Sequence, residues 1–252
     1  MLYATDGRTI CNAIIMARNI RNTGTPTSIP IVTLVSNAIP SDVVQHLRDA
    51  GIVAVEVNPW RQTNVKDSEW IEFLMKLRIF EERGYDKVIY LDSDAWVHRN
   101  LDHLFHLGDA VLWAPHAYYL TDRFWFGSTL LVFSPSNALF SQTEKAMANP
   151  RMPNYYDMDV INDLWNLDCG YLPNHYVVLS YTLNADTKWS FASKAERIAK
   201  TYVTHFSPGI GLGKLWNNAR NIFATRHGDE PLLKSLYESY WAAEDQLCSW
   251  LH

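Results

Sequence analysis

Two aspartates separated by one residue stand directly behind an apolar run. The run Val88–Leu91 predicts a buried strand, and Asp92 and Asp94 follow it at once. Because successive side chains of an extended chain alternate faces, this spacing puts both carboxylates on one side. Adjacent anions at the end of a buried strand repel each other and are costly to desolvate without a cation. The pattern predicts a divalent-metal site, although an isolated Asp-x-Asp is also common in solvated turns.

A histidine lies near the end of a second predicted strand, residues 202–206, and a glycine-rich loop follows this strand. A neutral imidazole at His205 is a suitable third ligand, and mixed oxygen and nitrogen coordination favours Mn²⁺. The next loop has three glycines within residues 209–213, so its backbone N–H groups can turn toward an anion, and Lys214 adds positive charge. These residues predict a metal held by Asp92, Asp94 and His205 beside a phosphate site. A histidine at a strand end is otherwise an ordinary core or surface residue.

Strands and helices alternate in the part of the chain that must position these groups. Apolar runs predict strands at 1–4, 29–35 and 53–57, with helices between them, the second capped by Ser41, and a further helix over 67–83 capped by Ser68. Alternation of this kind favours a parallel sheet that binds its ligand at the carboxyl ends of the strands. Later patterns predict strands at 88–91, 111–115 and 130–133, a strand pair at 171–173 and 177–179, and helices over 136–148, from Asp157, and from a cap at Asp229. The apolar face of the last helix is predicted to be core, with a homodimer surface as the alternative.

Composition narrows the function classes. The chain has 252 residues, 48% of them hydrophobic and 19% charged, which fits one globular domain over 1–252. A net charge of −5 gives no basic surface for nucleic acid or an anionic membrane, and we expect neither partner. The three cysteines are widely spaced, which argues against a disulfide framework and predicts a reducing, cytoplasmic location. No apolar run reaches the roughly 18 residues that a membrane-spanning helix needs.

Several segments resemble glycosyltransferase family 8, and the glycogenin-like members in particular. The segments 88–95 and 100–105 are similar to that family's metal-binding signature, and His205, Phe206, Gly211, Lys214 and Trp216 reproduce its second metal-binding segment. The resemblance implies one α/β domain of GT-A type, with a Rossmann-like, mixed or mostly parallel sheet flanked by helices. It also implies a UDP-sugar donor, Mn²⁺ or another divalent cation, and retention of the α configuration.

The same resemblance assigns further residues to the donor site. Lys76, in Met75-Lys76-Leu77, matches a lysine that points into the nucleotide-sugar site, and Thr5 and Asp6 stand where the family contacts uridine. Ser93, Gly211 and Lys214 join them as expected donor contacts. Asp157 matches an aspartate near the anomeric carbon, with Asp159 as the alternative if the register slips and a helix N-cap as its non-catalytic interpretation.

The sequence also departs from the family pattern around the donor sugar. Gly127 replaces a sugar-contacting Asn, Thr129 replaces a Gly, and Met158 replaces a Gln. Ser128 is kept, although a serine at a strand start is commonly structural. An aromatic residue of the family is Thr9 here.

The prediction of the acceptor depends on the absence of tyrosine from one segment. Residues 184–200 contain no tyrosine, which argues against self-glucosylation of the glycogenin kind. We therefore expect transfer of galactose or glucose to a glycan or glycoprotein hydroxyl, similar to family members that cap a glycan on a ubiquitin-ligase adaptor in protists. The alternatives are a non-catalytic UDP-sugar binder, a self-glucosylating primer, and a metal-dependent nucleotidyltransferase.

Overall fold

The computed structural model describes residues 1–60, 72–152, 155–183, 193–207, 214–216, 220 and 231–251. Its strands are β1 (Leu2–Ala4), β2 (Val32–Ser36), β3 (Val53–Val57), β4 (Val88–Leu91), β5 (Ala95–Val97), β6 (Leu112–Pro115), β7 (Leu130–Phe133), β8 (Cys169–Leu172), β9 (Val177–Leu179) and β10 (Val203–His205). Its α-helices are α1 (Gly7–Asn22), α2 (Ser41–Asp49), α4 (Asn137–Ala148), α5 (Asp157–Trp165), α6 (Lys194–Lys200) and α8 (Pro231–Leu247). Shorter 3-10 helices are η1 (Glu72–Phe80), η2 (Asp102–His106), η3 (Asn174–Tyr176), η4 (Ser180–Leu183) and η5 (Ser249–Leu251).

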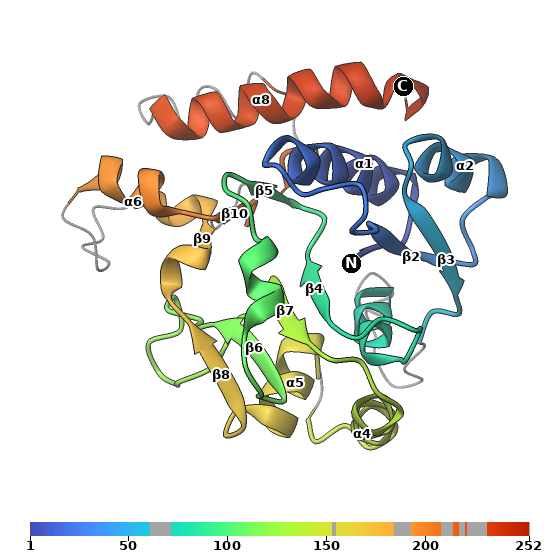
Figure 1. Cartoon of the computed structure of the whole chain (residues 1–252), viewed down its shortest axis with the longest axis vertical. Coiled ribbons are helices and arrows are strands. Elements are labelled where there is room, and N and C mark those ends of the chain that lie inside the picture. Colours follow the sequence, from blue (N-terminus) through green and yellow to red (C-terminus); the bar gives the residue numbers. More distant parts are fainter. Residues whose placement is uncertain are drawn as a thin grey trace.

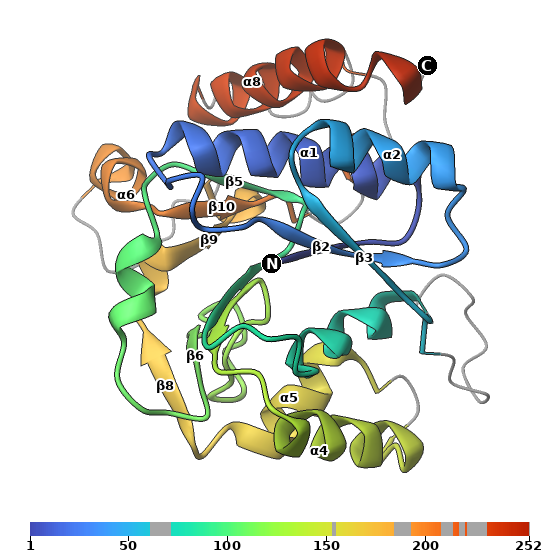
Figure 2. The same cartoon turned by 45° about the vertical axis from the view of Figure 1, so that its right-hand side comes forward.

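Residues 2–57 form a parallel sheet of three strands with helices α1 and α2 on one side. β2 pairs in parallel with both β1 and β3, and α1 and α2 make the two crossovers. Figures 1 and 2 show α1 and α2 next to each other over this sheet, with α8 lying across α1. The predicted strand–helix alternation is confirmed here. A right-handed crossover buries one face of each helix against the strands.

The strands β4, β6, β7 and β8 form a mixed sheet. β7 runs antiparallel to both β4 and β6, while β8 runs parallel to β6. A main-chain hydrogen bond from Leu91 N to Met1 O, 3.1 Å long, places β1 next to β4. β10 forms a separate small sheet between β5 and β9. Helices α4 and α5 lie side by side at the end of the molecule opposite α8 (Figures 1 and 2).

Three predicted elements differ from the structure. The segments 171–173 and 177–179 do not pair with each other, because β8 pairs with β6 and β9 pairs with β10. The described part of the helix predicted over 67–83 is the 3-10 helix η1, and Ser68 lies outside the described residues. Helix α2 has Pro40 rather than Ser41 at its N-cap position. In η1 the buried side chains of Leu74, Leu77 and Phe80 recur every three residues, which matches the 3-10 period.

The C-terminal helix belongs to the core. Its buried hydrophobic residues in the described part include Leu233, Leu236, Tyr237 and Tyr240, and the Tyr240 hydroxyl donates to Asn12 Oδ1 of α1 at 2.7 Å. Its predicted role as core is therefore confirmed, while the predicted cap Asp229 lies outside the described residues. Within the described ranges no helix combines the length and the apolar character that crossing a bilayer requires.

A disulfide joins the first and last long helices. Cys11 of α1 and Cys248, just after α8, are bonded with their Cα atoms 5.8 Å apart, and neither residue is exposed. Cys169 is the free cysteine. The expectation from the spacing was wrong for this pair, because the two residues, 237 positions apart, meet only when α8 folds back onto α1.

Removing this cross-link is expected to destabilise the protein. Replacing Cys11 or Cys248 by alanine should lower the free energy of unfolding by about 2–4 kcal/mol, because the unfolded chain regains the freedom of a long closed loop. Urea unfolding followed by circular dichroism measures the change. Cys169→Ala is the control. A reducing agent should lower the free energy of unfolding of the natural protein but leave that of Cys11→Ala unchanged. Equal stability of the natural protein with and without reductant would contradict the assignment.

Candidate functional site

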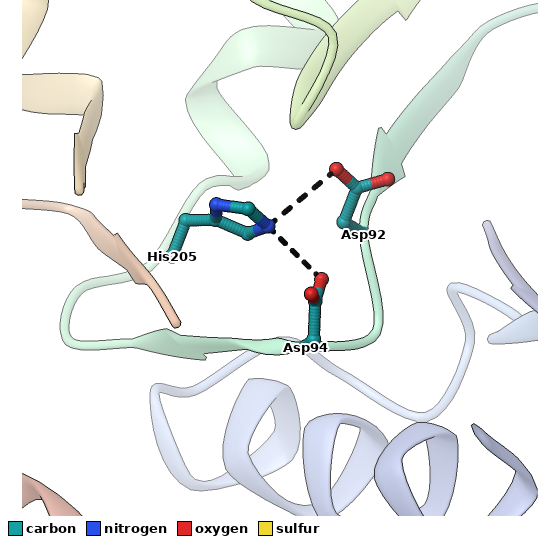
Figure 3. A group of neighbouring side chains, drawn as sticks. All are labelled: Asp92, Asp94 and His205. Carbon is teal, nitrogen blue, oxygen red and sulfur yellow. Dashed lines mark hydrogen bonds and ion pairs between the residues drawn. The ribbon is translucent and has the colours of Figure 1, made fainter. Parts of the chain in front are cut away.

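The predicted metal ligands come together at the junction of two sheets. Asp92 follows β4 and Asp94 precedes β5, while His205 ends β10, which pairs antiparallel with β5. His205 Nε2 lies 3.1 Å from Asp94 Oδ1 and 3.9 Å from Asp92 Oδ2. One ligand atom from each residue lies within 4.8 Å of the other two. Figure 3 shows the imidazole pointing between the two carboxylates.

These three residues fit a divalent cation. Two carboxylate oxygens and one imidazole nitrogen form a donor set that suits a borderline ion. Among the described residues, the other ring nitrogen, His205 Nδ1, is buried and without a hydrogen-bond partner. Among the described residues, the polar contacts of the His205 ring are therefore those with Asp92 and Asp94. A cation bound by the three side chains would relieve the repulsion between the two carboxylates.

A buried lysine joins the acidic pair to a third carboxylate. Lys76 in η1 is 4% exposed, and its Nζ lies 2.8 Å from Asp92 Oδ1 and 3.0 Å from Asp157 Oδ2. Lys76 also donates to Ser128 Oγ at 3.0 Å, and Ser128 donates to Asp157 Oδ2 at 2.9 Å. Burial lowers the pKa of Lys76, but Asp157 and Asp92 more than offset this and raise the pKa above its usual range. Lys76 is therefore a permanent cation.

Asp157, rather than Asp159, points into this network. Asp157 is the first residue of α5, whose N-cap position is Tyr156. The carboxylate of Asp159 instead accepts from Tyr156 N at 3.0 Å and closes the first turn of the helix. Burial opposes ionisation of Asp157, but Lys76 and hydrogen bonds from Lys76 and Ser128 hold its pKa below the usual value. The carboxyl group of Asp157 is thus an anion at neutral pH.

A second lysine compensates the charge of Asp94. The Lys214 ammonium group contacts Asp94 Oδ2 and donates to Phe206 O at 3.2 Å. Despite burial, His205 and Lys214 keep the pKa of Asp94 far below its usual range. The three carboxylates and the two lysines of the site together leave one net negative charge. This arrangement can accept a cation together with an anionic ligand.

Of the remaining predicted donor contacts, the structure describes Thr5, Asp6 and Ser93 but not Gly211. Thr5 connects β1 to α1, and Asp6 is the N-cap of α1, where its Oδ1 accepts from Thr9 N at 2.7 Å. The Thr9 hydroxyl in turn accepts from Thr5 N at 2.8 Å, so Thr9 serves the helix cap. Ser93 is buried in the turn between the two aspartates. Gly211 lies outside the described residues.

Three side chains at the site were not predicted from the sequence. Tyr90, two residues before Asp92 on the same face of β4, donates a hydrogen bond to Asp92 Oδ1. Tyr3 stacks against Tyr90 with ring centroids 6.4 Å apart, and burial together with the carboxylates of the site raises its pKa. Ser128 links Lys76 to Asp157, although a serine at the start of a strand commonly has a structural role. Strand alternation from Asp92 identifies Tyr90, but no local signal identifies the other two.

Comparison with known proteins finds relatives in sequence, although the chain spans less than half the length of several of them. No protein-family model matches it. It is 24% identical over 239 residues to galactinol synthase 1 of Solanum lycopersicum, covering 84% of this chain and 71% of that protein. Glucose N-acetyltransferase 1 of Gibberella zeae is 25% identical over 186 residues, and galactinol synthase 3 of Arabidopsis thaliana is 35% identical over 103 residues. These two matches cover 69% and 39% of this chain but only 41% and 30% of those relatives.

Solved structures agree on the fold. The galactosyltransferase LgtC, in complex with donor and acceptor sugar analogues, has a TM-score of 0.66 at 20% identity, covering 94% of this chain and 95% of that one. The glycosyltransferase GlyE of Streptococcus pneumoniae has a TM-score of 0.63 at 18% identity, covering 96% of this chain and 63% of that one. The chain has the GT-A glycosyltransferase fold. The predicted fold class is confirmed.

Replacing the buried lysine tests the electrostatics of the site. We expect Lys76→Met to lower the free energy of unfolding at pH 7 by about 3–5 kcal/mol, because the buried carboxylates lose their shared cation. Urea unfolding in the presence of EDTA measures this difference. Lys145→Met, an exposed lysine of α4, makes the same chemical change on the surface and is the control.

The deficit of Lys76→Met should depend on pH. The folded-state pKa of Asp157 lies below its ordinary value of 3.8, so its ion pair contributes stability above about pH 4. That contribution is lost as the pH falls through the lowered pKa. The difference between Lys76→Met and the natural protein should therefore be largest near pH 7 and shrink below pH 4. A difference that stays constant from pH 7 to pH 3 would argue against a charged pair.

Proposed function

We propose that this chain is a metal-dependent, retaining glycosyltransferase of family 8. It moves a hexose, galactose or glucose, from a UDP-sugar to a hydroxyl group of a glycan or glycoprotein and forms an α-linkage. The observation that carries the proposal is the convergence of Asp92, Asp94 and His205 within 4.8 Å of one another on a GT-A fold. Such a cluster beside Lys214 suits a diphosphate that binds together with a cation.

The relatives support hexosyl transfer. Galactinol synthases recur among the sequence matches, and the LgtC structure holds donor and acceptor sugar analogues. The charge pattern of the site agrees with the same chemistry. Breaking the bond between the anomeric carbon and the diphosphate builds negative charge on the leaving oxygen and positive charge on the sugar ring. The site provides groups of both signs at a short distance from one another.

A divalent cation, Mn²⁺ in this proposal, would be held by Asp92, Asp94 and His205. Bound there, it would supply Lewis-acid stabilisation of the diphosphate. Lys214 is the residue of this chain placed to neutralise the leaving group, since its ammonium already contacts Asp94 beside the cluster. Thr5 and Asp6 are proposed to contact the uridine, and Ser93 and Gly211 the diphosphate.

Asp157 is proposed to stabilise the sugar ring as an anion. Lys76 and Ser128 both contact its Oδ2 and fix the carboxylate in place. Because the low pKa of Asp157 keeps it ionised, it cannot donate a proton to the leaving group, but it can face positive charge that develops at the anomeric carbon. This role is compatible with attack by the acceptor hydroxyl from the side of the leaving group.

The acceptor and the cellular location remain predictions. The segment without tyrosine, residues 184–200, lies partly outside the described residues, so the argument against self-priming rests on its composition. A role like that of the family members that modify a ubiquitin-ligase adaptor is one form of the glycoprotein proposal. A cytoplasmic location is also a proposal, and the Cys11–Cys248 disulfide is of a type more common in oxidising compartments.

Donor hydrolysis tests the activity. With Mn²⁺ and no acceptor, the protein should release UDP from one or two members of a panel of UDP-sugars, because water can replace the acceptor hydroxyl slowly. Asp94→Asn should reduce this release by at least about a hundredfold, since removing one group that stabilises developing charge typically costs that much. Asp86→Asn, exposed at the other end of β4, is the matched control.

The outcomes separate the alternatives. UDP release that is lost in Asp94→Asn and kept in Asp86→Asn supports the transferase. Binding of UDP without release from any donor, even when glycan acceptors are added, favours a non-catalytic binder. Release of pyrophosphate points to a nucleotidyltransferase. A protein that does not bind UDP at all contradicts the proposal.

Metal binding can be measured independently of turnover. We expect isothermal titration calorimetry to show Mn²⁺ binding to the natural protein that is weakened in Asp94→Asn by more than the roughly 10–100-fold caused by losing an outer-shell partner. His205→Ala should have a similar effect, because it removes another ligand. Equal affinity in Asp94→Asn, His205→Ala and Asp86→Asn would place any bound ion elsewhere.

A further inference from the structure

Two adjacent tyrosines in the connection between β6 and β7 have different environments. Tyr118 is buried, its hydroxyl accepts from Leu179 N at 3.0 Å, and it lies 3.0 Å from the Thr182 hydroxyl. Main-chain hydrogen bonds of 2.8 Å, from Ala117 N to Trp125 O and from Gly127 N to Pro115 O, hold the two sides of the connection together. The position of the neighbouring Tyr119 is therefore fixed by the fold.

The hydroxyl of Tyr119 lies beside the Lys76 network. It is 3.6 Å from Met158 Sδ, and Met158 directly follows Asp157. It is also 3.7 Å from the point that a Cβ on Gly127 would occupy, and Gly127 directly precedes Ser128. The phenol thus fills the space that a longer side chain at position 127 would need. One neighbour, Met158, is thus adjacent in sequence to Asp157, and the other, Gly127, is adjacent to Ser128, which donates to the Asp157 carboxylate.

This hydroxyl is poorly satisfied by the protein itself. In the described part of the chain its hydrogen-bond partner is a thioether sulfur, which is a weak acceptor. Burial raises the pKa of Tyr119 to about 12, although Lys76 opposes the shift, so the phenol keeps its proton at neutral pH. A half-buried phenol normally finds a polar partner at its tip. The tip of Tyr119 therefore offers a hydrogen-bond donor next to Asp157.

We propose that Tyr119 is a donor-specificity residue whose hydroxyl binds one hydroxyl group of the transferred hexose. Met158 forms the apolar wall beside this contact, and Gly127 leaves room for the phenol. The inference rests on the proposed function, because it places the hexose next to Asp157. The contact is made to the sugar and not to the nucleotide, so Tyr119 discriminates between UDP-sugars and has no effect on UDP.

A comparison of protein and sugar variants tests the contact. UDP release is measured for the natural protein and Tyr119→Phe with the best UDP-hexose and its singly deoxygenated analogues. We expect Tyr119→Phe to lower kcat/KM for the full hexose roughly three- to tenfold, as loss of one neutral hydrogen bond does. For the analogue that lacks the contacted hydroxyl, the two proteins should have the same kcat/KM. Calorimetry should show weaker binding of the UDP-hexose to Tyr119→Phe and unchanged binding of UDP.

Tyr171→Phe is the matched control. Tyr171 is a partly buried tyrosine of β8 whose hydroxyl accepts from Asn166 at 3.1 Å, so the same atom is removed outside the site. Unchanged kinetics of Tyr119→Phe with every donor would overturn the inference. An equal decrease for every analogue, with lower thermal stability, would assign Tyr119 a structural role and overturn it as well. Absence of UDP release and of UDP-hexose binding in the natural protein would instead reject the proposed function itself.

Discussion

The neutralisation of clustered carboxylates is the constraint on which the structure of this site depends. Asp92, Asp94 and Asp157 lie close together at a largely buried place, where uncompensated charges are too costly to persist. Lys76 is shared by Asp92 and Asp157, and Lys214 contacts Asp94. The three carboxylates outnumber the two lysines by one, so the site keeps one net negative charge. A site in this state favours a divalent cation that arrives with a negatively charged ligand.

The two lysines compensate charge in different ways. Lys76 is buried within η1 and makes contacts with Asp92, Asp157 and Ser128, so it acts as a fixed part of the scaffold. Lys214 contacts Asp94 and one backbone carbonyl, and it stands between segments that lie outside the described residues. One lysine therefore sets the ionisation of Asp157, whereas the other compensates Asp94 and, in the proposed function, would also contact the diphosphate. The proposed transfer reaction uses both charges.

The departures from the family pattern around the donor sugar are connected in space. Gly127 and Met158 are far apart in sequence. The Tyr119 hydroxyl nevertheless contacts Met158 Sδ and lies next to the position that a Cβ on Gly127 would occupy. Relative to the resembled pattern, position 127 has no side chain and position 158 has no amide group. The phenol of Tyr119 lies beside both positions. In the proposed donor site, the Tyr119 phenol would take the place of the groups that the resembled family pattern has at these positions.

The sequence by itself determined the features that depend on local spacing. The apolar run before Asp92 and Asp94, the strand ending at His205 and the helix starting at Asp157 all follow from periodicity and chain punctuation. Contacts between distant segments were decided by the tertiary structure alone. β8 and β9 pair with different strands, and Cys11 is bonded to Cys248. Ser128 contacts Asp157, and Tyr119 contacts the adjacent Met158. Strand order and helix packing bring these residues together, and no local sequence pattern relates them.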